Sequence, residues 1–417
     1  MAKFVINGGN KLIGEIEVDS AKNSILPIIA GSILCKEKVV IKKCTKYSDT
    51  IKMCDILECL GAKISYDDDT LVLDNTNLHY AYIPSELTRD IRASFFTLGA
   101  MLARFKRAKI ALPGGCLIGL RGVDMHKKVF QELGVKFTKQ HGYIYCEYDE
   151  IQKRQIYFDF PSVGVTENAI MFCCANKGNF TLYNCAKEPE IVDLAKFLNS
   201  MGACIVGAGT NCIHIKGGET LKGVEYAPIP DRIVAGTLLV AGAITRGDIV
   251  LKNCNPKHLL PLIDILQKAG CDIKVESNAI HLQKNCTLQG FGRIDTQVYP
   301  GFPTDLQSQI TTLACLCCGT TLIKENIFEN RFNYVPELIK MGANINVENN
   351  LAIVNGVLEL FGADVYATDL RGGASLVLAG LVAKGYTTVH DIHYIDRGYF
   401  CLERQLTKLN ADIHRQE

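Results

Sequence analysis

A short pattern of apolar and polar residues returns six times along the chain. An amphipathic stretch ends at one small turn residue, and a stretch of alternating apolar and polar residues follows. The turn residues are Gly61, Gly134, Gly202, Gly270, Gly342 and Asn410, and the steps between them are 73, 68, 68, 72 and 68 residues. Glycine and asparagine best tolerate a positive φ angle, so each is predicted to end a helix. The pattern predicts one unit used six times.

Each repeat also contains a second helix, about half a period before the turn, with a different composition. The helices that end at the turns are amphipathic, and before Gly202 the apolar positions are Ile191, Leu194, Ala195, Leu198 and Met201. Asp193, Lys196 and Asn199 lie between them and are expected on the polar side. The other helices are apolar almost all round, so they must be buried. They are expected at residues 24–34, 93–102, 169–175, 233–244, 310–318 and 374–382.

Short alternating segments such as 272–275 and 344–347 are typical of half-exposed strands. Together with the buried helices they predict an α/β fold of two inside-out, α/β-barrel-like domains. Each domain would contain three of the six units, with helices inside and sheets outside.

The length of 417 residues exceeds what one hydrophobic core usually serves. The stretch 228–230, with two prolines, lies between the third and fourth units and is the expected crossing point. We predict one domain at 20–229 and a second at 1–19 with 230–417. The strand expected at 14–18 has a pattern that suits pairing with either domain. A cleft is expected between the two domains.

Composition adds little to this picture. With 45 basic and 44 acidic residues the formal net charge is +1, which gives no reason to expect nucleic-acid or membrane binding. The longest apolar stretch, 233–244, is too short to span a bilayer, and no apolar signal segment opens the chain. We therefore expect a cytoplasmic protein without a membrane span. The 18 cysteines show no secreted framework, and Cys315 to Cys318 are expected to be structural, so no metal or cofactor is predicted.

Candidate chemistry lies at the starts of the buried helices. The residues at these starts are Lys22, Asn23, Arg92, Ser162, Val163, Gly164, Asp231, Arg232, Asp305, Asp369 and Arg371, and most of them are charged or polar. Helix N-termini attract anions, and neighbouring basic residues strengthen that attraction. Aspartate is also a common N-cap, so capping and catalysis are equally good interpretations of Asp231 and Asp369. For Arg92 and Arg371, a solvated first-turn residue is the weaker interpretation, because a basic charge at a helix start needs an anion.

The segment 113–122 has four glycines and a proline, which is typical of an irregular loop. It places Cys116 five residues before Arg121, so the thiol has access and a nearby positive charge, which favour the reactive thiolate. The alternative is a passive cysteine in a chain that has many.

The loop and nine further motifs, in order and over essentially the whole chain, resemble UDP-N-acetylglucosamine 1-carboxyvinyltransferases. Besides residues 113–126, the motifs are 20–23, 92–94, 162–164, 188–193, 230–232, 302–305, 328–331, 367–371 and 395–399. This family transfers an enolpyruvyl group from phosphoenolpyruvate to the 3′-hydroxyl of UDP-N-acetylglucosamine and releases phosphate, as the first committed step of peptidoglycan synthesis. It has two inside-out α/β domains.

The resemblance implies a role for each matched residue. Asp305 is a base candidate at the 3′-hydroxyl, and Cys116 is the acid at C3 of phosphoenolpyruvate. The cations around phosphoenolpyruvate are Lys22, Arg121, Arg331, Arg371 and Arg397. The sugar nucleotide is held by Asn23, Arg92, Asp124, Ser162, Val163, Gly164 and Ile327, and the supporting acids are Glu188, Asp231 and Asp369. The expected partners are these two substrates. No cofactor or nucleic acid is implied, and the sequence does not identify protein regulators.

Two alternatives stand beside this hypothesis. One is the related enolpyruvyl transferase that acts on shikimate 3-phosphate, and the cysteine loop argues against it. The other is a non-catalytic paralogue that binds UDP-sugar, and the presence of Lys22, Cys116, Asp305 and Arg397 argues against it.

Overall fold

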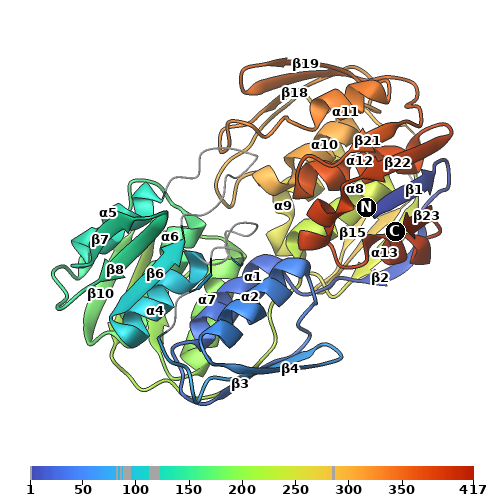
Figure 1. The fold of residues 1–417 in the computed structure, drawn as a ribbon. Helices are drawn as coiled ribbons and strands as arrows, with labels where there is room; N and C mark the ends of the chain where they lie inside the picture. Colours follow the sequence, from blue (N-terminus) through green and yellow to red (C-terminus); the bar gives the residue numbers. More distant parts are fainter. Residues whose placement is uncertain (1, 81–82, 85–86, 88–94, 112–122, 284–286) are drawn as a thin grey trace. The chain divides into compact units, whose positions relative to one another are not determined.

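The computed structural model describes residues 2–80, 83–84, 87, 95–111, 123–283 and 287–417 (Figure 1). The chain divides into two compact units. The C-terminal unit comprises the described residues between Met1 and Asp19 and between Pro230 and Glu417, and the N-terminal unit comprises those between Ser20 and Ile229. Each unit has its own cluster of buried apolar side chains.

The N-terminal unit contains helices α1 (Lys22–Ser32), α2 (Ser48–Cys59), α4 (Thr97–Phe105), α5 (Asp124–Glu132), α6 (Val163–Ala175) and α7 (Pro189–Ser200). Its strands are β3 (Lys38–Ile41), β4 (Lys63–Asp67), β5 (Thr70–Asp74), β6 (Arg107–Ala111), β7 (Lys136–Gln140), β8 (Tyr143–Glu147), β9 (Gln155–Tyr157), β10 (Gly178–Tyr183), β11 (Cys204–Val206), β12 (Cys212–Gly217) and β13 (Glu225–Tyr226). They form three sheets, in the orders β13-β3-β5-β4, β6-β8-β7 and β11-β12-β10-β9.

The C-terminal unit contains helices α8 (Arg232–Ile244), α9 (Leu260–Lys268), α10 (Gln307–Ala314), α11 (Val335–Lys340), α12 (Leu370–Val382) and α13 (Leu402–Lys408), with 3₁₀ turns η2 (Pro256–His258), η3 (Thr304–Leu306) and η4 (Ile392–Arg397). Its strands are β1 (Lys3–Asn7), β2 (Ile13–Glu17), β14 (Asp248–Lys252), β15 (Asp272–Val275), β16 (Ala279–Gln283), β17 (Arg293–Asp295), β18 (Thr320–Lys324), β19 (Asn344–Glu348), β20 (Leu351–Asn355), β21 (Asp364–Tyr366), β22 (Tyr386–His390) and β23 (Asp412–Gln416). Its sheets are β15-β16-β14-β2, β17-β18-β20-β19 and β21-β22-β1-β23.

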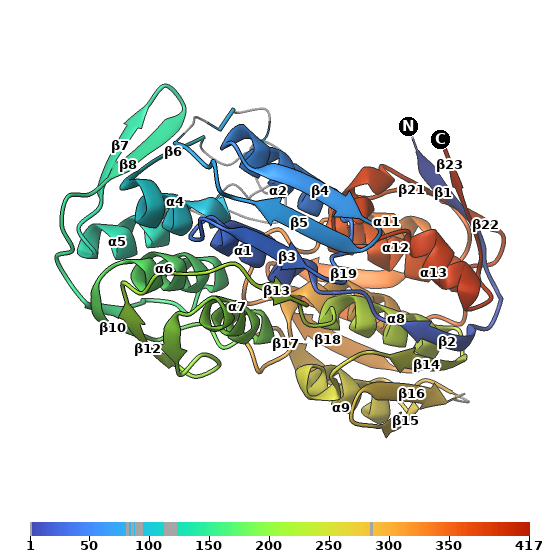
Figure 2. The same cartoon turned by 90° about the horizontal axis from the view of Figure 1, so that it is seen from below.

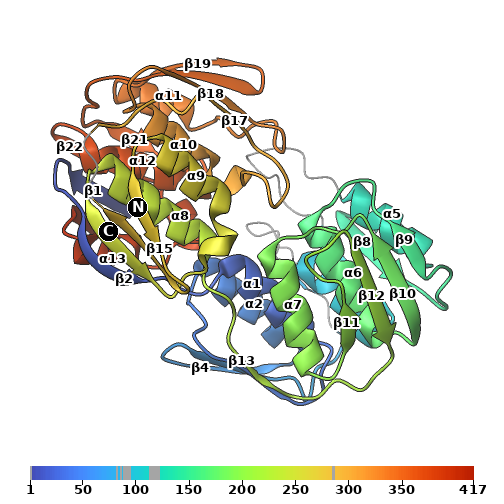
Figure 3. The same ribbon diagram turned by 180° about the vertical axis from the view of Figure 1, so that it is seen from behind.

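Figures 2 and 3 show the fold from two further sides. In each four-stranded sheet one parallel pair is joined to antiparallel pairs. The N-terminal strand β1 lies between β22 and β23 and pairs antiparallel with both, so that Ile6 is opposite Ile413. Buried and more exposed residues alternate along strands such as β12 and β16, as expected for sheets covered on one face.

The six predicted turn residues all have a positive φ angle. The values are 94° at Gly61, 104° at Gly134, 108° at Gly202, 93° at Gly270, 95° at Gly342 and 77° at Asn410. At each of them a helix has ended two residues before and a strand begins two residues later. The prediction of a helix stop is confirmed at every position.

The apolar helices are buried along their length. Every residue of α8 and α10 is buried, and so is α12 from Arg371 to Leu381. These three helices pack against one another, and in the other unit α4 packs against α1 and α6. Several predicted boundaries are wrong: α6 begins at Val163 and not at residue 169, α12 begins at Leu370 and not at residue 374, and α10 ends at Ala314 and not at Cys318.

The polar face predicted for α7 needs a correction. Asp193 is only 1% exposed. Its carboxylate accepts hydrogen bonds from the Tyr226 hydroxyl at 2.6 Å and from the Ile229 amide at 3.1 Å. The residue therefore ties α7 to β13 and to the segment that follows it, a contact that helical periodicity does not reveal.

Candidate active site

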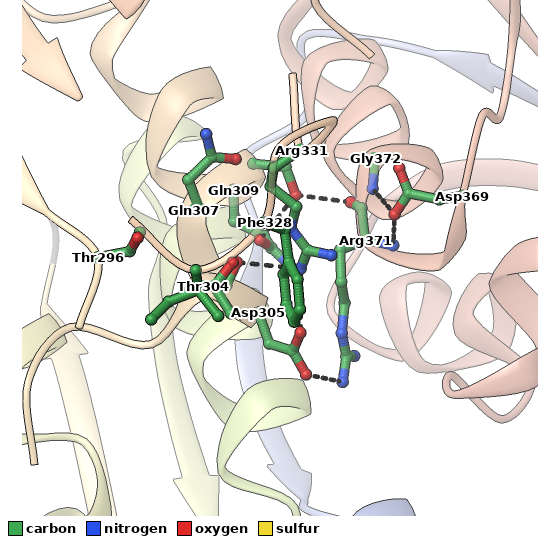
Figure 4. A network of polar contacts seen from close by, with 12 residues as sticks. Thr296, Thr304, Asp305, Gln307, Gln309, Phe328, Arg331, Asp369, Arg371 and Gly372 are labelled. Carbon is green, nitrogen blue, oxygen red and sulfur yellow. Dashed lines mark hydrogen bonds and ion pairs between the residues drawn. The ribbon is translucent and has the colours of Figure 1, made fainter. Parts of the chain in front are cut away.

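Three charged side chains from distant parts of the sequence meet in the C-terminal unit (Figure 4). Asp305 lies in η3, after Pro303. Its Oδ1 accepts a hydrogen bond from Nη2 of Arg331 at 3.0 Å, and its Oδ2 accepts one from Nη2 of Arg371 at 3.2 Å. Arg331 lies between β18 and α11, and Arg371 is the second residue of α12. The structure thus joins three predicted site residues around one carboxylate.

Both arginines of this cluster are buried. The side chains of Arg331 and Arg371 are 2% and 3% exposed, and that of Asp305 is 27% exposed. Burial alone would lower the pKa of Arg371, but Asp305, Tyr399 and Asp231 raise it above its ordinary value. A solvated Arg371 is therefore the wrong interpretation: the anion that its helix position requires is an internal carboxylate.

The two arginines have further N–H donors that make no hydrogen bond to the described residues. Among the described residues, Nε of Arg331 and both Nε and Nη1 of Arg371 are buried without a hydrogen-bond partner. A guanidinium group has five N–H donors and no acceptor, so only an acceptor oxygen or an aromatic face suits these positions. The Arg371 guanidinium lies 5.4 Å from the centre of the Tyr399 ring. The cluster has the chemistry to bind an additional anion.

Two predicted acids cap helices. Oδ1 of Asp231 accepts the amides of Ile233 and Val234 at 2.8 and 3.0 Å at the start of α8. Oδ1 of Asp369 accepts the amides of Arg371 and Gly372 at 2.9 and 3.1 Å at the start of α12. The capping interpretation is confirmed for both. Through its cap, Asp369 fixes the turn that carries Arg371.

A buried polar network next to Arg371 links helices α8, α10 and α12. Nε2 of Gln309 donates to the Tyr399 hydroxyl at 3.0 Å and to Thr237 Oγ1 at 3.1 Å. The Ser308 hydroxyl donates to the Arg371 carbonyl at 2.9 Å. Because these buried groups hydrogen-bond to one another, they fix the angular positions of α8, α10 and α12.

In the N-terminal unit, Lys22 is the first residue of α1 and Asn23 the second. Nζ of Lys22 is 3.4 Å from Oδ2 of Asp49, and the two side chains are 12% and 4% exposed. Asp49 belongs to the first turn of α2 and was missed by the sequence reasoning. Its placement near a helix N-terminus was an available signal.

The residues matched to the nucleotide end lie at the starts of two helices. Asp124 is the exposed first residue of α5, and Ser162 precedes α6, whose first residues are Val163 and Gly164. The Ser162 side chain makes no cap bond. A Cβ atom at Gly164 would lie 3.6 Å from Nε2 of the buried His126, so α5 and α6 meet at these starts.

Three acids gather near the start of α7. Glu188 is at its N-cap position, and Glu190 is 3% exposed. Glu167 in α6 is 1% exposed, and burial, with help from Glu190 and Glu188, raises the pKa of its carboxyl well above the ordinary value. The sequence reasoning missed Glu167, although a glutamate in an apolar helix was a signal for it.

Two further predicted residues lie in the C-terminal unit. Arg397 is the half-buried last residue of η4, and Ile327 is half-buried in the loop after β18. Arg92, Cys116 and Arg121 lie outside the described residues, so their predicted positions stay predictions.

Among the described residues there is no group of three or more histidine, cysteine or acidic side chains arranged to hold a metal ion. In the same part of the chain, no helix is long and apolar enough to cross a membrane.

The sequence matches known proteins over its whole length. The family model of EPSP synthase (3-phosphoshikimate 1-carboxyvinyltransferase) matches residues 6–406. UDP-N-acetylglucosamine 1-carboxyvinyltransferase 2 of Caldanaerobacter subterraneus subsp. tengcongensis is 47% identical over 415 residues, with all of both chains covered. UDP-N-acetylglucosamine 1-carboxyvinyltransferase 1 of Staphylococcus aureus (strain MRSA252) is 45% identical over 419 residues, with 100% of this chain and 99% of the relative covered.

Solved structures give the same result for the fold. The enolpyruvyl transferase NikO from Streptomyces tendae superimposes with a TM-score of 0.90 at 26% identity, over 100% of this chain and 99% of that one. EPSP synthase from Acinetobacter baumannii superimposes with a TM-score of 0.75 at 17% identity, with both chains fully covered, and this likeness concerns the fold alone. The chain has an α/β fold of the EPSP synthase type and belongs to the EPSP synthase family, among the UDP-N-acetylglucosamine 1-carboxyvinyltransferases.

Proposed function

We propose that this chain, as a member of that family, transfers the enolpyruvyl group of phosphoenolpyruvate to the 3′-hydroxyl of UDP-N-acetylglucosamine and releases phosphate. The observation that carries the proposal is full-length identity of 43–47% to relatives named for this activity. The product would enter peptidoglycan synthesis as its first committed intermediate. The cluster of Asp305, Arg331 and Arg371 supports the proposal, because it supplies the charges that the reaction needs.

The reaction is an addition followed by an elimination. In the addition the sugar oxygen bonds to C2 of phosphoenolpyruvate, a base takes the hydroxyl proton, and an acid protonates C3. In the elimination C3 loses a proton and phosphate leaves from C2, which restores the double bond. We assign the base to Asp305 and the acid to Cys116.

Phosphoenolpyruvate carries a phosphate and a carboxylate on adjacent atoms, so several cations must surround a small volume. We assign this binding to Lys22, Arg121, Arg331, Arg371 and Arg397. The buried donors of Arg331 and Arg371 that have no hydrogen-bond partner among the described residues suit the additional oxygens.

The pairing of Asp305 with two arginines suggests how the base becomes available. Without substrate, its carboxylate neutralises Arg331 and Arg371. An incoming phosphate or carboxylate offers the same arginines alternative acceptors, so it weakens their hold on Asp305. The carboxylate is then able to turn to the sugar hydroxyl. Binding of phosphoenolpyruvate would thus release the base that the reaction uses.

We assign the sugar nucleotide to residues at helix starts and in one loop. They are Asn23, Arg92, Asp124, Ser162, Val163, Gly164 and Ile327. Glu188, Asp231 and Asp369 would support the site, the two aspartates by capping α8 and α12.

We also propose the domain bounds, the repeated units within each domain and the cellular location of the protein. In this description the domains are 20–229 and 1–19 with 230–417. Each is an inside-out, barrel-like arrangement of three repeated units, and the six positive-φ turn residues support the repeat. Consistent with the proposed substrates, the cytoplasm is the location that we assign.

Phosphate release tests the proposal. The protein is incubated with phosphoenolpyruvate and either UDP-N-acetylglucosamine or shikimate 3-phosphate as acceptor. We expect release with the sugar nucleotide only. Release with shikimate 3-phosphate alone would identify the other transferase, and binding of the sugar nucleotide without release from either acceptor would identify a non-catalytic paralogue.

A further inference from the structure

Glu325 is a buried acid to which the proposed reaction assigns no role. It follows β18 directly and is 2% exposed. Its backbone is held on both sides by Asn350: the Glu325 amide donates to the Asn350 carbonyl at 2.8 Å, and Nδ2 of Asn350 donates to the Glu325 carbonyl at 3.0 Å. The side chain therefore starts from a fixed position at the end of the sheet.

One carboxylate oxygen of Glu325 holds the loop after β18. Oε1 accepts the amide of Ile327 at 2.8 Å and the amide of Phe328 at 3.2 Å. It also accepts the hydroxyl of Thr296 at 2.9 Å, and Thr296 Oγ1 accepts the amide of Asn326 at 2.9 Å. Three consecutive residues, including the predicted sugar-nucleotide contact Ile327, are thereby fixed to Glu325.

The other carboxylate oxygen holds the turn that carries Asp305. Oε2 of Glu325 accepts the hydroxyl of Thr304 at 3.0 Å. Thr304 is adjacent to Asp305 in η3, and its carbonyl accepts Nη2 of Arg331 at 3.0 Å. Figure 4 shows Thr304 beside the Asp305–Arg331 pair. The path from Glu325 to the proposed base passes through a single residue.

We propose that Glu325 is a positioning residue that sets the place of Asp305 and of the loop 326–328 together. The proposal rests on the proposed function of Asp305 as base. One buried carboxylate would thus keep the proton acceptor in register with a segment that contacts the acceptor substrate.

The energetics favour a rigid arrangement. A buried carboxylate is costly unless hydrogen bonds satisfy it, and hydrogen bonds to a charged group are about twice as strong as neutral ones. Glu325 accepts four, from two hydroxyls and two amides. Moving the loop 326–328 or the turn with Thr304 would leave one buried carboxylate oxygen of Glu325 with too few hydrogen bonds. A misplacement of about 1 Å at a reacting group costs on the order of 100-fold in rate.

The first test is kinetic and uses Thr304→Val, which removes the link to Glu325 with little change in shape. We expect kcat for phosphate release to fall about 10- to 100-fold with KM for UDP-N-acetylglucosamine changed less than about threefold. Thr304→Ser keeps the hydroxyl and should restore kcat to within about threefold. Thr245→Val removes a buried hydroxyl at the end of α8 in the same unit and serves as the control. A kcat for Thr304→Val within about twofold of wild type would overturn the proposal.

A double variant asks whether Thr304 acts through Asp305. If it does, adding Thr304→Val to Asp305→Ala should leave the residual rate of Asp305→Ala unchanged. If the two effects multiply, Thr304 acts independently of the base and the proposal is wrong.

Hydrogen exchange tests the same link without turnover. Glu325→Gln keeps the shape of the side chain but removes its charge and replaces one acceptor oxygen by an NH2 donor, so the hydrogen bonds accepted at that position are lost or reversed and the others weaken. We expect amides in 304–306 and in 326–328 to exchange at least about threefold faster in this variant. Glu337→Gln, which alters an acid that accepts the Tyr366 amide, should change neither segment. An unchanged rate in either segment would overturn the proposal, and a wild-type protein without phosphate release would instead refute the proposed function.

Discussion

Replacing Asp305 by alanine separates its chemical role from its role as a counter-ion. As the proposed base, the residue should contribute about 10²- to 10⁴-fold to kcat, the range for a positioned proton-transfer group. KM for UDP-N-acetylglucosamine should change far less, because the sugar nucleotide has other contacts in the proposal. We therefore expect a large loss of turnover with retained sugar-nucleotide binding.

The same variant should also be less stable. It leaves the side chains of Arg331 and Arg371, 2% and 3% exposed, without the carboxylate that neutralises them. Removing one partner of a buried ion pair costs about 3–5 kcal/mol. Because 27% of the Asp305 side chain is exposed, water compensates in part, and we expect about 2–3 kcal/mol. For a unit of this size that lowers Tm by about 4–12 °C.

Inorganic phosphate distinguishes the two roles. It should bind Arg331 and Arg371 in Asp305→Ala and raise the free energy of unfolding by about 2.7 kcal/mol at 100 times its Kd, and Tm should rise with it. Turnover should not be restored. Asp295→Ala breaks an exposed pair with Arg293 in the same unit and should cost at most about 1 kcal/mol. Turnover is measured by phosphate release and Tm by calorimetry. Near-normal turnover in a less stable Asp305→Ala would refute the assignment as base.

Three further predictions concern other residues. Cys116 should be the one cysteine alkylated by a phosphonate epoxide such as fosfomycin, and the sugar nucleotide should speed this alkylation. Cys116→Asp should keep substantial turnover and resist the epoxide, whereas Cys116→Ala should largely lose turnover. Peptide mapping that finds other cysteines labelled would contradict the role of Cys116. Burial raises the pKa of Asp19 from 3.8 to about 6 despite a hydrogen bond from Gln405, so stability should fall as pH rises through that window, and Asp19→Asn should raise Tm at pH 8 but not at pH 4, which thermal melts check. Asp369→Ala should lose about 1 kcal/mol of stability in denaturant unfolding through its lost N-cap; an unchanged midpoint would contradict the cap's contribution.

The helix stops at the six turn residues could be predicted because they depend on local physics. A positive φ angle at Gly61 or Asn410 follows from the residue type and from the end of an apolar period. The end of α10 was misjudged for the same reason: the apolar composition continues to Cys318, while the helical backbone stops at Ala314. Composition alone does not encode that stop.

The candidate residues of the C-terminal unit were found singly, but their pairing was not. Asp305, Arg331 and Arg371 were named from motifs and helix starts, whereas their ion pairs depend on how η3 and α12 pack. Glu325 escaped notice because its four partners come from three separate segments of the chain. Asp49 was missed for the same reason, because its contact with Lys22 forms only when α2 packs beside α1.

The central claim is that the chain joins phosphoenolpyruvate to UDP-N-acetylglucosamine. The most direct measurement is mass and NMR analysis of the sugar nucleotide after incubation with wild-type protein and phosphoenolpyruvate. The account predicts an enolpyruvyl ether at the 3′-oxygen, formed in equal amount to the phosphate released. Unmodified sugar nucleotide from a folded protein that binds both compounds would contradict it.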